Sequence, residues 1–107
     1  MCEFQPLYVN KDGYVASCTR CGYYHIGYAS TILVFSAIEF EELCKVVKHK
    51  CMKKVYQLHE NSKTIYIPAP SEKIALLFTR KQAARFSEIL DAADTERKAL
   101  ELISMFN

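Results

Sequence analysis

The sequence predicts an α+β fold in which helices pack on an antiparallel sheet, and three observations lead to this class. A hydrophobic run at 31–36 returns forty-three positions later at 74–79, which indicates a duplicated unit. Each run ends in a hydroxyl residue, Ser36 or Thr79, at the position where a helix N-cap belongs. Strand-type composition precedes both caps, so we expect two βββα repeats after one N-terminal strand.

The length of 107 residues predicts a single domain over 1–107, with the repeats at 14–54 and 55–107. Half of the residues are hydrophobic and about a quarter are charged, which is the composition of a globular protein with its own core. The net charge of +2 is too small to indicate a nucleic-acid or membrane partner.

The first half begins with strands. Residues 3–9 and 14–18 are rich in strand-forming residues and flank the polar turn 10–13. Aromatic and β-branched residues then predict strands at 23–28 and 31–35, joined by a short turn.

Ser36 caps a predicted helix that runs to about Lys53. Glu39 follows three residues after Ser36, which completes a capping box. Apolar residues recur at helical spacing along this segment. Cys44 and Cys51 lie on that apolar stripe, where a cysteine usually behaves as a small buried hydrophobe.

The second half repeats the plan. Strands at 55–58 and 64–67 flank a polar turn at 60–63, and a further strand is expected at 73–78. The corresponding turn holds no cysteine, so the thiols of the first half are not part of the duplicated plan.

The final helical stretch, from Arg80 to Phe106, is unusually long. A single helix of this length would span about 40 Å at 1.5 Å per residue, more than a small sheet needs as cover. Because Asp94 is a plausible second N-cap, we expect a break or kink there.

Two predicted strands, 32–35 and 74–78, are apolar at consecutive positions. Such strands are usually covered on both faces. Either the helices lie on opposite sides of the sheet, or a second copy of the protein covers an open face. A homodimer is therefore one expectation.

Cys18 and Cys21 form the one motif with chemical content. A C-x-x-C pair followed by Gly22 can bend around a metal, with backbone amides turned toward the sulfur atoms. The motif leads into a strand, whereas redox-active C-x-x-C pairs usually open a helix.

The hairpin adds a third thiol. If Val9 faces Tyr14 across the turn, Cys2 lies opposite Cys21, and three sulfur atoms converge. Zinc needs a fourth ligand. His25 is our candidate, with Cys44 and Cys51 as alternatives, although an extended strand would place His25 about 13 Å from Cys21.

Other residues give weaker signals. If the strand at 23–28 binds anything, Arg20, Tyr23 and His25 are the expected contact residues. Aromatic residues on a sheet can stack nucleobases, and lysines gather at the end of the first helix. Strand propensity and compensation of the helix dipole explain both features without a nucleic acid.

We therefore expect a non-enzymatic binding or scaffold module with a structural zinc site at Cys2, Cys18, Cys21 and His25. The expected partner is a protein or a second copy, not a nucleic acid or a membrane. The alternative is a thiol redox protein or sensor that uses Cys18 and Cys21, and a weaker alternative is an RNA-binding module.

The segment from residue 2 to residue 45 resembles a family of short uncharacterised proteins of the Bacteroidota, known as a domain of unknown function. The resemblance rests on Cys2, Gly13, Cys18, Cys21 and Phe40. It implies no activity. Without a basic leader, a secretory signal or a long apolar run, the expected location is the cytoplasm.

Overall fold

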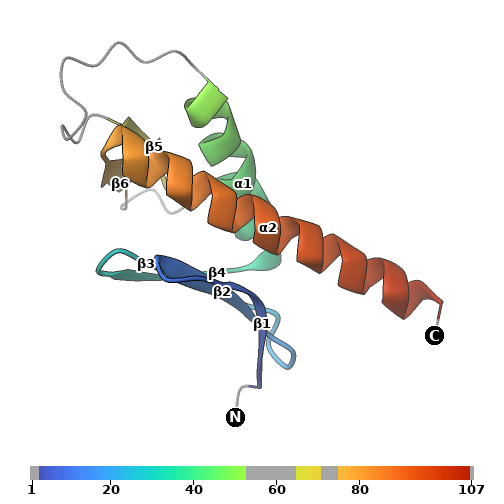
Figure 1. Cartoon of the computed structure of the whole chain (residues 1–107). Coiled ribbons are helices and arrows are strands. Elements are labelled where there is room, and N and C mark those ends of the chain that lie inside the picture. The colour runs from blue at the N-terminus through green and yellow to red at the C-terminus, as the bar shows by residue number, and fades with distance from the viewer. Residues whose placement is uncertain (1–2, 53–64, 71–74, 107) are drawn as a thin grey trace.

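The computed structural model describes residues 3–52, 65–70 and 75–106, and every structural statement below refers to them. Six strands and two helices follow one another (Figure 1): β1 (Phe4–Val9), β2 (Gly13–Cys18), β3 (Tyr24–Tyr28), β4 (Thr31–Phe35), α1 (Ala37–Met52), β5 (Ile65–Pro68), β6 (Ala75–Phe78) and α2 (Arg80–Met105). The strands form a four-stranded and a two-stranded antiparallel sheet. The predicted α+β class is confirmed.

β1 to β4 form a meander in which each strand pairs with the next. The turn between β1 and β2 depends on Asn10, whose side-chain oxygen accepts hydrogen bonds from the backbone amides of Asp12 and Gly13 at 2.8 and 3.0 Å. An asparagine that bonds the backbone two and three residues on favours a tight turn. The predicted turn and the predicted pairing of Val9 with Tyr14 are both confirmed.

The register of this hairpin changes along its length. Tyr8 pairs with Val15, but Pro6 pairs with Ala16, so Leu7 is an extra residue in a β-bulge. Phe4 consequently lies opposite Cys18. The single register that predicted Cys2 opposite Cys21 is wrong for the part of β1 before the bulge, and Cys2 itself lies outside the described residues.

Both predicted helix caps are confirmed. The backbone amide of Glu39 donates to the Ser36 hydroxyl at 3.2 Å, and the amide of Ser36 donates to the Glu39 carboxylate at 2.9 Å. Thr79 and Gln82 form the same reciprocal pair at the start of α2, at 3.1 and 3.0 Å. Each pair satisfies two backbone donors that a helix start leaves without partners.

The predicted break near Asp94 is wrong, because α2 is one helix over 26 residues. The Asp94 carboxylate does not cap a new helix. It forms ion pairs with Arg97 at 2.7 Å and Lys98 at 3.0 Å, three and four residues further along the same helix. Such spacings stabilise an existing helix.

The second hairpin differs from the expected single sheet. β5 and β6 pair with each other, with Ile65 opposite Phe78, and form a separate two-stranded sheet. β6 covers Ala75–Phe78 of the predicted strand 73–78, whose first two residues lie outside the described residues, and β3 begins at Tyr24 instead of residue 23. The predicted strand at 55–58 and the turn at 60–63 lie outside the described residues.

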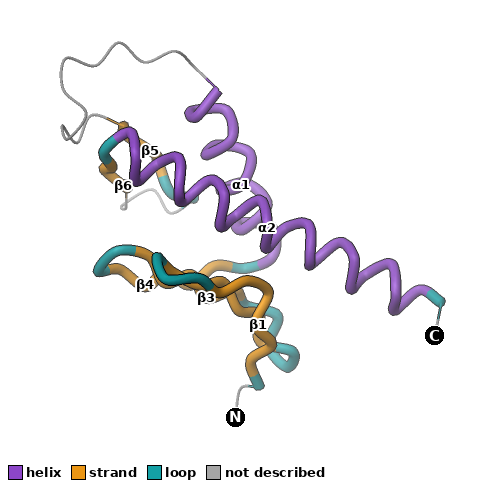
Figure 2. The backbone as a smooth tube through the Cα atoms, in the orientation of Figure 1, coloured by secondary structure: helices purple, strands orange, loops and turns teal. Residues whose placement is uncertain are grey.

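The two helices lie on the same side of the four-stranded sheet (Figures 1 and 2). α2 packs on β1 and β2, while α1 packs on β4 and β5. The centre of the core is aromatic: Phe86 of α2 lies 5.0 Å from the ring of Tyr28 and 5.2 Å from that of Phe78, centre to centre. The Tyr28 hydroxyl donates to the carbonyl of Gln82 at 2.7 Å, which connects the sheet to the first turn of α2.

Candidate functional site: an open sheet face beside the C-x-x-C turn

The C-x-x-C turn closes the end of β2. The backbone amide of Gly22 donates to the Cys18 carbonyl at 2.9 Å, and the amide of Cys21 points at the Cys18 sulfur at 3.4 Å. Gly22 has a φ of 77°, a conformation that glycine adopts without steric cost. Cys18 is only 2% exposed, whereas Cys21 is exposed. An amide directed at a sulfur atom is the arrangement that the spacing predicted.

The predicted metal ligands that the structure describes, Cys18, Cys21 and His25, do not form a metal-binding group. His25 lies in the middle of β3, opposite Ala16 and Val34, and its ring meets that of Phe4 edge to face at 4.6 Å. Within 3–52, 65–70 and 75–106, no three histidine, cysteine, aspartate or glutamate residues are grouped so that they could hold a metal ion. A zinc site that includes Cys2 therefore stays a prediction.

Two further predicted contact residues lie at or beside the turn. The Arg20 guanidinium forms an ion pair with the Glu3 carboxylate at 3.3 Å, and both side chains are well exposed. The Thr19 amide and hydroxyl donate to the backbone carbonyl of Glu3 at 2.9 and 3.2 Å. Tyr23 is nearly half exposed. This end of the hairpin is thus tied together by polar contacts at the surface.

The sheet has a second face, directed away from both helices. Side chains alternate along a strand, and the register places the outward ones of all four strands side by side. We call this the outer face; its members are Phe4, Pro6, Val9, Tyr14, Ala16, Cys18, His25, Gly27, Ile32 and Val34. None of them is an aspartate, glutamate, lysine or arginine.

Four apolar side chains of the outer face are largely exposed. Val9 and Ile32 are about two thirds exposed, and Phe4 and Val34 are half exposed. The Tyr14 ring occupies the space above Gly27, where an added Cβ would come within 2.1 Å of it. Gly27, which has no side chain, lets the Tyr14 ring lie directly on the backbone of β3.

The tyrosines of β3 belong to the opposite, inner face. Tyr24 stacks on Phe40 of α1 with ring centres 4.6 Å apart, and Tyr28 is in the core. Burial raises the pKa of both phenols above its ordinary value. These two rings cannot stack nucleobases without leaving the core. Strand propensity and core packing account for their presence.

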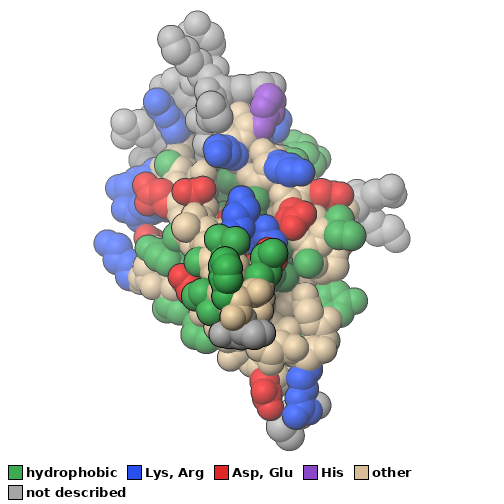
Figure 3. Space-filling view, turned by 90° about the vertical axis from the view of Figure 1, so that its right-hand side faces the viewer, with side chains coloured by type: hydrophobic (Ala, Val, Ile, Leu, Met, Phe, Trp, Pro, Cys, Tyr) green, Lys and Arg blue, Asp and Glu red, His purple; other side chains and the backbone are tan. Residues whose placement is uncertain are grey.

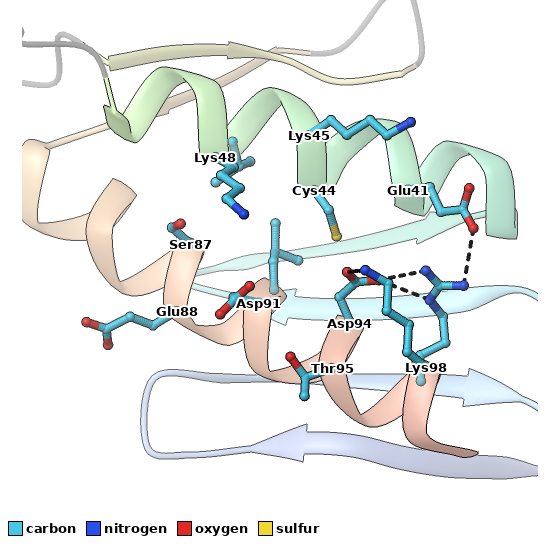
Figure 4. Close-up of a pocket in the computed structure, with 13 residues that line it drawn as sticks. Glu41, Cys44, Lys45, Lys48, Ser87, Glu88, Asp91, Asp94, Thr95 and Lys98 are labelled. Atoms are coloured by element: carbon cyan, nitrogen blue, oxygen red, sulfur yellow. Dashed lines mark hydrogen bonds and ion pairs between the residues drawn. The ribbon is translucent and has the colours of Figure 1, made fainter. Parts of the chain in front are cut away.

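A cleft of about 650 Å³ lies between α1 and α2 (Figure 4). The Cys44 thiol points into it, and burial, with Asp94 nearby, raises the pKa of this thiol to about 12. Cys44 therefore stays protonated near neutral pH and is a poor nucleophile. The cleft also presents balanced charges: Glu41, Glu88, Asp91 and Asp94 against Lys45, Lys48, Arg97 and Lys98. Sequence reasoning did not find this cleft, because its charged residues come from both helices.

A second apolar surface lies at the end of α2. Leu102, Ile103, Met105 and Phe106 are all more than half exposed. Hydrophobic side chains gather at the end of the molecule that faces the viewer in Figure 3. The last turns of α2 extend past the part of the helix whose residues reach the core, which ends at Leu100.

Comparison with protein families identifies a match. A family model described as a family of unknown function (DUF6686) matches residues 1–106. Neither the curated proteins nor the solved structures contain a match. No described helix has the length and apolar character needed to cross a membrane.

Proposed function

Because the chain belongs to this family, whose description assigns no activity, we propose from the site itself that it is a non-enzymatic binding module. Its docking surface is the outer face. The observation that carries the proposal is a sheet face with four largely exposed apolar side chains and no aspartate, glutamate, lysine or arginine. In an antiparallel sheet with one face on the core and one face in water, the residues on the water-exposed face are usually polar.

The size of the outer face agrees with this role. Four strands at about 4.8 Å spacing and five to six residues at about 3.3 Å rise cover roughly 350 Å² in projection, and on the order of 500 Å² of accessible surface. Contiguous apolar patches of about 300–600 Å² are the largest that monomeric proteins usually show, and they often mark interaction sites.

We further propose that zinc fixes the hairpin at the corner of this face, bound by Cys2, Cys18, Cys21 and His25. The turn supports the proposal because the Cys21 amide already points at the Cys18 sulfur, a contact that stabilises a thiolate. His25 supports it because the strand register places it on the same face as Cys18. Zinc in such a site would be structural, since four protein ligands leave no position for a substrate.

Metal analysis tests the zinc site. Protein purified without added metal is expected to contain close to one zinc per chain by inductively coupled plasma mass spectrometry. Cys21→Ser should lose the metal, whereas Cys44→Ser, in the interhelical cleft, should keep it. Wild-type protein without zinc would refute the site. If Cys18 and Cys21 then form a reversible disulfide under mild oxidation, the redox alternative replaces it.

Binding of an uncharged apolar dye tests the docking surface. At nanomolar protein concentration, Nile red fluorescence should rise with wild-type protein and fall in the double variant Ile32→Lys/Val34→Lys. The control Glu42→Lys changes an exposed position on α1 and should bind dye as the wild type does. Circular dichroism verifies that all three proteins are folded. Equal fluorescence from the folded double variant would show that the outer face is not an accessible apolar surface.

A further inference from the structure

We infer that the partner of the outer face is a second copy of this chain, packed face to face about a two-fold axis. This inference rests on the proposed function, since it names the occupant of the same surface. In such a dimer two four-stranded sheets form a sandwich, and each protomer carries its helices on the outside. Sheets pack in this way at about 10 Å separation, with strands inclined by about 30°.

The absence of charge favours a second copy over an unrelated partner. A two-fold interface places the same surface of both copies in contact, so a charged group near the axis lies close to the identical charge of the second copy. None of the outer-face residues is an aspartate, glutamate, lysine or arginine. Nucleic acids and anionic membranes attach through lysine and arginine, which this face lacks.

The pattern of β4 points the same way. Leu33 and Phe35 are buried against the helices, while Ile32 and Val34, which alternate with them, are exposed. A strand that is apolar on both faces is typical of a sheet that is covered on both sides. In the described structure both helices lie on one side of the sheet, and a second copy would cover the other side (Figure 1).

The side chains over the middle strands pack against the sheet or against one another. The Tyr14 ring lies over Gly27, and the His25 ring packs edge to face on Phe4 at 4.6 Å. The exposed Phe4, Val9, Ile32 and Val34 belong to the two outer strands, β1 and β4. They lie on both sides of the middle strands, where they can interdigitate with their counterparts in a second copy.

The area predicts the strength of the association. Two outer faces together bury on the order of 1,000 Å², close to the minimum for a specific interface and well below that of an obligate dimer. The dimer is therefore expected to be in equilibrium with a folded monomer. A core of Phe86 and its neighbours that is complete within one chain agrees with this expectation.

Sedimentation equilibrium of the full chain tests the inference. The apparent mass should rise from the monomer mass of 12.3 kDa toward twice that value as the concentration increases from nanomolar to high micromolar. Val9→Lys on β1 and Val34→Lys on β4 should each weaken the dimer by about tenfold or more, because each places like charges in the interface. Both positions are at least half exposed in the monomer, so the variants should stay folded.

Leu102→Lys is the matched control, since it changes an exposed apolar residue at the end of α2 and should leave the dimer unchanged. A monomer at every concentration overturns the inference. A dimer that is lost only in Leu102→Lys also overturns it, because the interface would then lie on α2. A dimer that Val9→Lys leaves intact overturns it as well, because the interface would then be confined to the edge of β4. If the monomeric protein still binds Nile red through the outer face, the docking surface survives with a different partner.

Discussion

Arg97 is expected to contribute more to stability than any other charged side chain described here. It extends from α2 toward α1, and its side chain is only 10% exposed. Its guanidinium contacts Asp94 at 2.7 Å, Glu101 at 3.1 Å and Glu41 of α1 at 3.2 Å. Removing it by Arg97→Met keeps most of the apolar stem and deletes the three ion pairs.

The exposure of each partner sets the magnitude. Glu101 and Glu41 are about half or more exposed, so each of these pairs is worth about 0–1 kcal/mol. Asp94 is 20% exposed, and a hydrogen bond to a charged group in such a position contributes about 1.5–3 kcal/mol. We therefore expect Arg97→Met to lower the free energy of unfolding by about 2–3 kcal/mol, nearly all of it through Asp94.

The Asp94–Arg97 pair also predicts a pH dependence. Burial raises the pKa of Asp94, but the hydrogen bonds from Arg97 and Lys98 outweigh this effect, so the pKa lies below its ordinary value. A lowered carboxyl pKa stabilises the fold above the pKa of the unfolded chain, near 4, and the stabilisation is lost as the pH falls through the folded pKa. The difference between wild type and Arg97→Met should therefore shrink below about pH 4.

Urea unfolding at neutral and acidic pH measures these differences. Arg97→Met should lower the midpoint without changing the slope. A double-mutant cycle with Asp94→Asn should return a coupling energy of about 1.5 kcal/mol or more, and Glu41→Gln alone should cost less than about 1 kcal/mol. The reasoning would be refuted if Glu41→Gln cost as much as Arg97→Met, or if the coupling to Asp94 were absent.

Three further predictions concern the core, the caps and the interhelical thiol. Phe86→Ala removes a fully buried ring and should cost about 3–5 kcal/mol in chemical unfolding, whereas Phe106→Ala, 87% exposed, should stay within about 0.5 kcal/mol of wild type. Ser36→Ala and Thr79→Ala should each cost about 1 kcal/mol by the same measurement, and equal stability would show that these caps are not formed in solution. The raised pKa of Cys44 means that the folded chain retains this proton longer than the unfolded chain. Stability should fall as the pH rises above about 9, and Cys44→Ala should reduce that fall in thermal unfolding scans; an unchanged pH profile would contradict the pKa shift.

Local signals predicted much of the fold. Ser36 and Thr79 mark helix starts because the cap and its Glu or Gln partner lie within one turn. Aromatic and β-branched residues predicted the strands at 23–28 and 31–35, which the structure has as β3 and β4. Each of these predictions needs only the residues within a few positions of the one concerned.

The errors came from features that local patterns do not fix. A bulge at Leu7 changes the hairpin register by one residue, and no residue type announces it. Asp94 has the chemistry of an N-cap, but Arg97 and Lys98 give its carboxylate partners within the helix. Which side of a sheet a helix covers depends on tertiary packing, so the sequence left open whether the outer face is covered.

The bulge in β1 has a consequence for how far self-association can proceed. Pro6 offers no backbone N–H, and the extra residue Leu7 interrupts the ladder of a strand that ends its sheet. Continuous edge-to-edge growth of a sheet needs two edge strands that can each pair with another molecule, and in this sheet the edge formed by β1 is disrupted. A chain built this way can expose an apolar sheet face to water and form dimers without growing into fibrils.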